Sequence, residues 1–196
     1  SVLCQLVSLS KAKDDFENLK KYLDEQKSIL EDYIRKNPTM EEAFQDPLIF
    51  NELYYAYYYL EMNQPHPAFE HLQKGAKYLT PHTYFMYRVL YYDAYAFYYR
   101  RCKEYDKALS QLDSTIVLLQ EAFSSDYVNQ LSAKADILVE AGRSQEALPI
   151  YEKVLQMKDS LVTELSDKQM KLIQSNYHIN KIAPVSYTHL TLPTNS

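Results

Sequence analysis

Histidines and cysteines are the residues of this chain whose chemistry is most versatile. The five histidines are His66, His71, His82, His178 and His189. His66 and His71 lie five residues apart, which places them on different faces of a helix, and no cysteine or carboxylate set completes a metal site around them. His71 could accept a phosphoryl group in a helical phosphotransfer module, but packing within a helix is the simpler role. We therefore predict no metal site and no cofactor.

Cys102 is the other residue whose setting suggests reactivity. It stands beside Arg100, Arg101 and Lys103, and cationic neighbours can activate a thiol. The alternative is an inert cysteine in a turn. We recognise no motif that pairs a nucleophilic side chain with a general base, and the acidic residues follow no catalytic pattern. The sequence therefore predicts no catalytic residues, and an all-helical enzyme is the least favoured hypothesis.

Composition narrows the possible partners. The chain has 196 residues and a net charge of −5, so it carries no basic surface for nucleic acid. The sequence contains no stretch of 18 apolar residues, so we predict no membrane-spanning helix in it. Two glycines are too few for β-hairpins or a phosphate loop. The 20 tyrosines fall mostly in helix-compatible stretches, where we expect packing between helices.

Helical periodicity and capping signals divide the chain into helices. Apolar residues at three-and-four spacing predict a first long helix over 11–36, ended by Asn37-Pro38. The first ten residues are either its beginning or the remnant of an apolar leader. Further helices are expected over 46–63, 67–79 and 81–101, around Ala108, from Asp126 to Gly142, from Ser144, and over 163–181.

Alanines recur along this helical pattern. Ala68, Ala108 and Ala147 are 40 and 39 residues apart, and a second alanine lies twelve residues before each of them, at Ala56, Ala96 and Ala135. Small residues at such positions allow two helices to cross closely. A bulky residue follows each central alanine by four, at Leu72, Leu112 and Tyr151. This spacing predicts a repeated helix-turn-helix unit.

The pattern resembles the tetratricopeptide repeat, although the family's tryptophan is absent and its first-helix glycine is alanine. The resemblance covers three units, 49–82, 89–122 and 128–161. It implies an all-α fold, a right-handed superhelix of stacked antiparallel helix pairs. Such a stack needs terminal covers, which we assign to residues 1–48 and to a helix over 162–183.

The same resemblance implies a binding groove on the first helix of each unit. Its residues would be Phe50, Leu53, Tyr57, Leu60, Glu61, Leu90, Asp93, Phe97, Arg100, Arg101, Asn129, Ser132, Asp136, Val139 and Glu140. This mixture of aromatic and charged side chains suits an extended peptide or a helix of another protein. Family members that hold chaperone tails use Lys and Asn where this chain has Leu53 or Asp93, so that function is not expected. The alternative is that many of these side chains pack against their own chain.

The segment Tyr151–Leu161 and the polar helix after it resemble the end of the sensor region in Bacteroidota signalling regulators. That resemblance implies a sensing module, on the periplasmic side of a membrane-tethered protein, followed by a histidine kinase or a helix-turn-helix domain. Residues 184–196 resemble a translated sequencing-adapter tail, which predicts a truncated chain with a disordered, non-native end. A genuine terminus is the alternative. A stand-alone adaptor in the cytoplasm is the second functional hypothesis.

Overall fold

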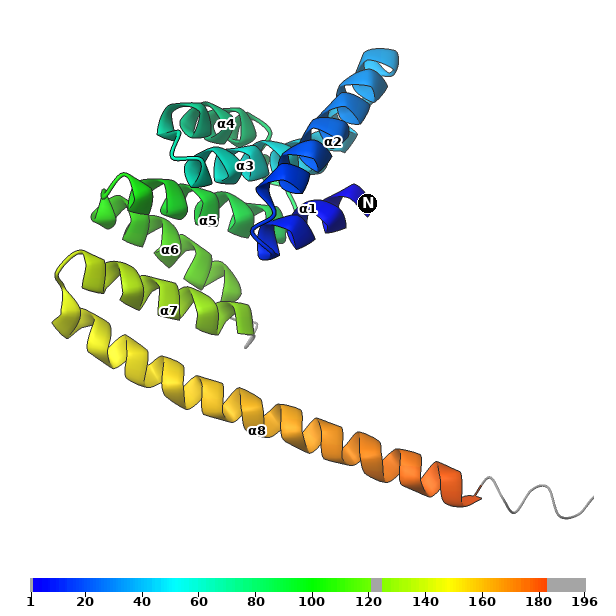
Figure 1. The fold of residues 1–196 in the computed structure, drawn as a ribbon, viewed down its shortest axis with the longest axis vertical. Helices are drawn as coiled ribbons and strands as arrows, with labels where there is room; N and C mark the ends of the chain where they lie inside the picture. Colours follow the sequence, from blue (N-terminus) through cyan, green and yellow to red (C-terminus); the bar gives the residue numbers. More distant parts are fainter. Residues whose placement is uncertain (1, 121–124, 183–196) are drawn as a thin grey trace, which may run out of the picture. The chain divides into compact units, whose positions relative to one another are not determined.

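The computed structural model describes residues 2–120 and 125–182, with the backbone alone for 40–42, 165, 173 and 176–182. Every regular element in these residues is helical, so the predicted all-α class is confirmed (Figure 1). The chain divides into two compact units, Ser1–Tyr151 and Glu152–Ser196. The predicted tail at 184–196 lies outside the described residues.

The helices follow one another with short connections. In chain order they are α1 (Val2–Ala12), α2 (Phe16–Lys36), the 3-10 helix η1 (Pro38–Phe44), α3 (Gln45–Glu61), α4 (Pro65–Lys77), α5 (Phe85–Arg101), α6 (Tyr105–Leu119), α7 (Ser125–Glu140) and α8 (Ser144–Ile182). Within the first unit, α3 packs against α4 and α5 against α6, and α3 also contacts α5 (Figure 1). From α1 to α7, helices that are consecutive in the chain thus contact each other.

The predicted first helix over 11–36 is wrong at its beginning, because a turn separates α1 from α2. Asp14 has a left-handed φ of 54°, and the Asp15 N–H donates to the Ser10 carbonyl oxygen at 2.9 Å. The Asp15 carboxylate then caps α2 by accepting from the Asn18 N–H at 3.1 Å. Residues 2–12 therefore form a helix of their own.

Two other predicted helix boundaries also differ from the structure. Helix α5 begins at Phe85 and not at Pro81, because the Thr80 N–H donates to Thr83 Oγ1 at 2.8 Å and holds these residues in a turn. The separate helix expected over 163–181 does not exist, since α8 runs without interruption from Ser144 to Ile182. Gly142 ends α7 with a φ of 76°, as a glycine after a helix does.

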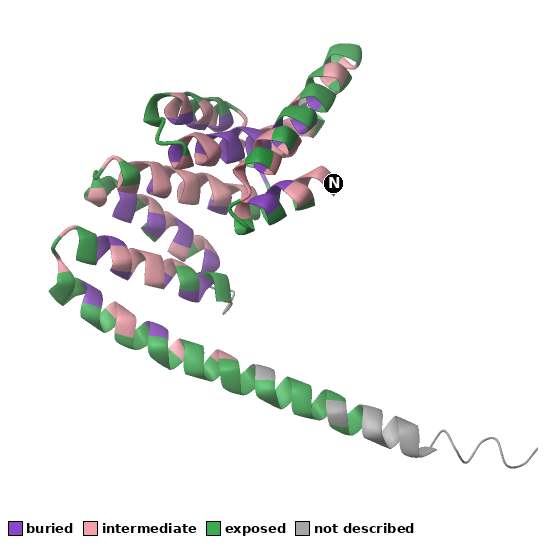
Figure 2. Ribbon diagram, viewed as in Figure 1, coloured by how far each residue is buried: buried purple, intermediate pink, exposed green. Residues whose placement is uncertain are grey.

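All six repeat alanines are buried in the core of the first unit. Ala56 and Ala68 pack with Leu53, Leu60 and Leu72 between α3 and α4. A second cluster joins α5, α6, α7 and the start of α8 through Ala96, Ala108, Ala135 and Ala147. Each of the six exposes at most 2% of its surface. Figure 2 shows buried stretches along the helices of the first unit.

A third cluster joins the first two helices to α3. Val7 of α1 and Leu19 and Leu23 of α2 pack against Phe50 and Tyr54. Farther along the chain, tyrosines of α5 such as Tyr95 and Tyr98 are half-buried against the α3–α4 cluster. These contacts fit the expectation that tyrosine serves mainly for packing between helices.

Candidate functional site

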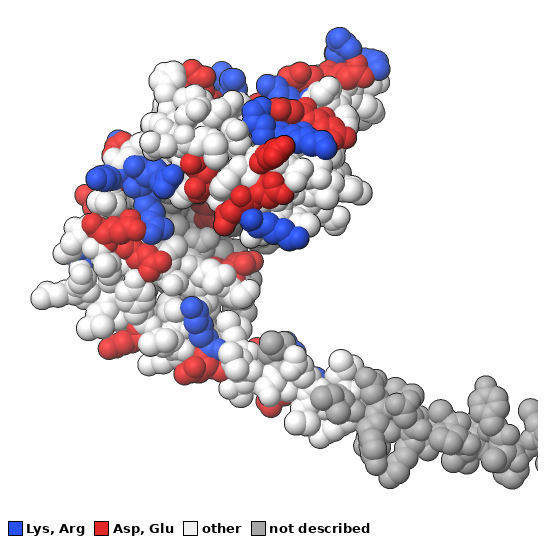
Figure 3. All heavy atoms as spheres, in the orientation of Figure 1, with Lys and Arg blue, Asp and Glu red and all other residues white. Residues whose placement is uncertain are grey.

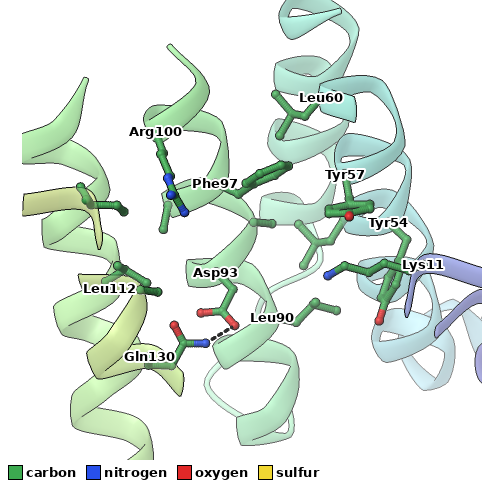
Figure 4. A pocket seen from close by; sticks show the side chains of 15 residues that line it. Lys11, Tyr54, Tyr57, Leu60, Leu90, Asp93, Phe97, Arg100, Leu112 and Gln130 are labelled. Atoms are coloured by element: carbon green, nitrogen blue, oxygen red, sulfur yellow. Dashed lines mark hydrogen bonds between the residues drawn. The ribbon is translucent and has the colours of Figure 1, made fainter. Parts of the chain in front are cut away.

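Seven of the predicted groove residues line one cavity, which has a volume of about 230 Å³ and lies within the first unit (Figure 4). They are Leu53, Tyr57, Leu60, Leu90, Asp93, Phe97 and Arg100. We call this volume the α3–α5 cavity, because these two helices supply most of its wall. Its other lining residues are Lys11 of α1, Tyr54 of α3, Ala94 and Ala96 of α5, Leu112 of α6, and Gln130, Ala133 and Ile137 of α7.

Asp93 provides the carboxylate of the α3–α5 cavity. Its Oδ1 accepts from Thr115 Oγ1 on α6 at 2.9 Å. Its Oδ2 accepts from Gln130 Nε2 on α7, also at 2.9 Å (Figure 4). Burial disfavours the charged form and raises the pKa of Asp93 to about 6, although the two hydrogen bonds and Lys11 act in the opposite direction. Asp93 therefore links three helices at the cavity wall and titrates close to neutral pH.

Lys11 brings a cation into the cavity from α1. Its ammonium lies 4.3 Å from the centre of the Tyr57 ring and 5.4 Å from that of Tyr54, within cation–π range of both (Figure 4). Burial lowers the pKa of Lys11, and the nearby carboxylates of Asp93 and Glu61 oppose this effect. The cavity thus holds a partly desolvated ammonium group.

Arg100 is the second cation of the cavity and is bound to a carboxylate outside it. Its Nε donates to Glu140 Oε2 at 3.0 Å and its Nη2 to Glu140 Oε1 at 2.5 Å. These hydrogen bonds raise the pKa of Arg100 and lower that of Glu140. Because Glu140 ends α7 and Arg100 lies near the end of α5, the pair fixes these two helix ends together.

The other predicted groove residues do not line the cavity. Phe50 stacks on Tyr54 with ring centres 4.3 Å apart and belongs to the cluster with α1 and α2. Arg101 donates through Nη2 to the Leu60 carbonyl oxygen at 2.9 Å. Asn129 is exposed, and Asp136 accepts a 2.5 Å hydrogen bond from the Tyr151 hydroxyl. For Phe50 and Asp136 the structure shows the alternative role, packing against their own chain.

Acidic and basic side chains are intermixed around this region. On the face drawn in Figure 3, Lys and Arg lie among Asp and Glu along the helices of the first unit. The ion pairs Arg100–Glu140 and Arg101–Glu61, the latter at 3.9 Å, account for part of this mixing. No single sign of charge dominates this face.

His71 and Cys102, the two residues considered for reactivity, both lie in the first unit. His71 Nδ1 lies 2.6 Å from Glu52 Oε2, and its ring stacks on Tyr55 and Tyr59 with centres 4.9 and 5.3 Å apart. Cys102 is half-buried at the end of α5. Among the residues described, no group of three or more His, Cys, Asp or Glu side chains could hold a metal ion.

Sequence reasoning missed Lys11, Tyr54 and Gln130 as cavity residues. The repeat register assigns no groove position to residues before the first unit, so it contains no signal for Lys11. Gln130 follows the predicted Asn129 by one position, and Tyr54 follows Leu53 in the same way. A register taken from a loose resemblance cannot decide which of two adjacent side chains enters the cavity.

Comparisons with known proteins add no family to these observations. The sequence matches no protein-family model, and it matches none of the curated proteins. Within residues 2–120 and 125–182, none of the helices combines the length and the apolar character that crossing a bilayer requires.

Proposed function

We propose that this chain is a non-enzymatic binding module whose α3–α5 cavity receives part of a peptide or of another protein. The observation that carries the proposal is the cavity itself: four helices, α3, α5, α6 and α7, line it with apolar side chains, and Lys11, Asp93 and Arg100 also belong to its wall. A pocket of this kind offers an apolar anchor site together with polar groups that fix orientation.

A tetratricopeptide-like array is the architecture we propose for the first unit. Two features support it: helices adjacent in the chain pack against each other, and alanines at the repeated positions lie buried where they do so. In this architecture the first helices of successive units, α3, α5 and α7, face a common groove. The proposed partner would lie along that groove and insert a side chain into the α3–α5 cavity.

The sensing region of a bacterial regulator is the biological setting we propose, with a stand-alone adaptor as the second candidate. The support is the resemblance of Tyr151–Leu161 and the polar residues that follow. A long sequencing read of the source locus beyond codon 183 separates the two. An apolar span and a kinase or DNA-binding domain in frame would favour the regulator, and a stop codon would favour the adaptor.

Peptide selection tests the binding function. The purified chain is panned against a random-peptide phage library, and the same selection is run on Phe97→Ala, which removes a ring from the cavity wall. The control is Tyr84→Ala, because Tyr84 is 56% exposed and does not line the cavity. We expect peptides that bind the original chain and Tyr84→Ala but bind Phe97→Ala at least tenfold more weakly, roughly the cost of one lost anchor. Peptides that bind all three alike would contradict the proposal.

Thermal unfolding of each variant accompanies the selection, since a loss of fold would also abolish binding. A variant that unfolds at the temperature of the original chain and still fails to bind locates the defect in the cavity.

A further inference from the structure

An apolar stripe follows one side of α8 within the second unit. Leu155, Val162 and Leu172 expose 63%, 67% and 63% of their surface. Among the other side chains described between residues 155 and 172, Met157 and Leu161 are half-buried and the rest are exposed (Figure 2). Large apolar side chains scattered singly are normal on a protein surface, but several on one side of a helix indicate a contact surface.

The spacing of the stripe is typical of a helix that pairs with another helix. Seven residues separate Leu155 from Val162, and seven more lead to Gln169. A second series with the same interval begins at Lys158 and continues through Leu165 to Leu172. Together the two series give the alternating steps of three and four residues of a heptad repeat, whose two inner positions form the seam between paired helices. The stripe therefore predicts that its partner is a helix.

The order of residues along this seam makes it complementary to itself. From its beginning to its end the seam consists of Leu155, Lys158, Val162, Leu165, Gln169 and Leu172. In two antiparallel copies centred between residues 163 and 164, each position faces the one that is equally far from the centre. Leu155 then faces Leu172 of the second copy, and Val162 faces position 165, so apolar residues meet. Lys158 faces Gln169 of the second copy, whose amide oxygen is an acceptor for an ammonium group.

A parallel pair fits this sequence less well. It places every seam residue opposite itself, so the two Lys158 ammonium groups would face each other, and like charges in contact are unfavourable. The flanks of the antiparallel seam contain no such conflict between residues 155 and 172. Asp159 faces Ser166 along one flank, and Leu161 faces Lys168 along the other. The sequence therefore favours the antiparallel pair.

We propose that a second copy of this chain covers the stripe, with the two α8 helices antiparallel over residues 155–172. The occupant is a second copy because the seam matches its own reverse, whereas a helix of another protein would have to supply the same order of residues independently. None of the residues that line the α3–α5 cavity belongs to this surface. The inference therefore goes beyond the proposed function and does not depend on it.

Val162→Glu tests whether the stripe is the dimer contact. Thr163→Glu is the matched control, because Thr163 is the adjacent exposed residue, lies on another side of α8 and undergoes the same change of charge. Sedimentation equilibrium of the 196-residue chain and of both variants is measured from about 1 to about 100 μM, and circular dichroism verifies that helix content is unchanged. We expect the original chain and Thr163→Glu to dimerise. The dissociation constant of Val162→Glu should be at least tenfold higher, because each copy then buries a carboxylate against an apolar position.

The double substitution Lys158→Glu with Gln169→Lys tests the orientation of the two helices. In an antiparallel pair it places opposite charges at the two contacts between positions 158 and 169. In a parallel pair it places like charges at both positions. Its net charge equals that of Thr163→Glu, so the two variants are compared directly. We expect the double variant to dimerise at least as tightly as Thr163→Glu.

Three results would overturn the inference. A chain that stays monomeric up to about 100 μM, or a dimer that is equally tight in Val162→Glu and in Thr163→Glu, would show that no second copy covers the stripe. A double variant that dimerises at least tenfold more weakly than Thr163→Glu would contradict the antiparallel arrangement. Peptide binding at the α3–α5 cavity is measured separately, so none of these results decides the proposed function.

Discussion

Asp93→Asn is the substitution that tests the cavity most directly. The replacement is nearly isosteric and removes the carboxylate charge while keeping one acceptor for Thr115 Oγ1. It leaves Lys11 in place in the same cavity. The experiment therefore asks whether the charge of a partly buried carboxylate at this position destabilises the fold at neutral pH.

The size of the effect follows from the pKa of Asp93. Burial raises this pKa from 3.8 to about 6, so the folded protein holds the proton more tightly than the unfolded chain does. Stability is then highest when Asp93 is protonated, falls as the pH rises between 3.8 and 6, and stays low above that range. The full loss is about 3 kcal/mol of unfolding free energy, and the part that falls between pH 5 and pH 8 is about 1.4 kcal/mol.

Urea denaturation of both proteins at pH 5 and pH 8 measures this quantity. The unfolding free energy of Asp93→Asn, minus that of the original chain, should increase by up to about 1.4 kcal/mol from pH 5 to pH 8. Constant effects of the substitution, such as a weaker bond to Gln130, cancel in this comparison. Asp106→Asn is the control, since the Asp106 side chain is 94% exposed and pairs with Arg143 at the surface. A difference that is constant with pH, or that decreases, would refute the reasoning.

Three further substitutions test the packing of the first unit by chemical denaturation. Ala108→Leu should cost about 1–3 kcal/mol, because Ala108 is fully buried where helices cross; an unchanged midpoint would argue against a close crossing there. Glu52→Ala should cost roughly 2–4 kcal/mol, since it leaves His71 without its partner at 2.6 Å, and stability equal to the original would mean that the pair contributes little. Gly142→Ala should cost about 1–2 kcal/mol from its φ of 76° alone, because no atom lies within 4 Å of the added methyl group, and no loss would be inconsistent with a left-handed residue.

Much of the helix order could be predicted because its signals are local. Ser144 begins α8 and Gly142 ends α7 as their capping chemistry predicts. The prediction failed where a specific side-chain hydrogen bond shifted the beginning of a helix. Thr80-Pro81 has the composition of a helix start, but the Thr83 hydroxyl binds the Thr80 N–H and delays α5 to Phe85. Residue types alone do not show which hydroxyl lies within hydrogen-bond distance of which backbone N–H.

Part of the cavity was also predictable, for a geometric reason. Leu53, Tyr57, Asp93 and Phe97 are spaced by four residues within α3 and within α5, so each pair lies on one face of its helix. Once α3 packs beside α5, the two faces can meet at one cavity. The hydrogen bond from Gln130 to Asp93 was not predictable in this way, because it depends on how α7 is rotated about its own axis.

The position of Lys11 shows why a site of this kind exceeds what periodicity can predict. A single helix over 11–36, as the apolar spacing suggests, would place Lys11 on the first turn of the helix that contains Leu19 and Leu23. The chain turns instead at Asp14, whose left-handed backbone lets α1 fold back and bury Val7 in the same cluster as Leu23 and Tyr54. This reversal places the Lys11 ammonium 4.3 Å from the Tyr57 ring. The place of Lys11 in the α3–α5 cavity thus depends on one aspartate in an uncommon conformation, and on no feature of the repeats.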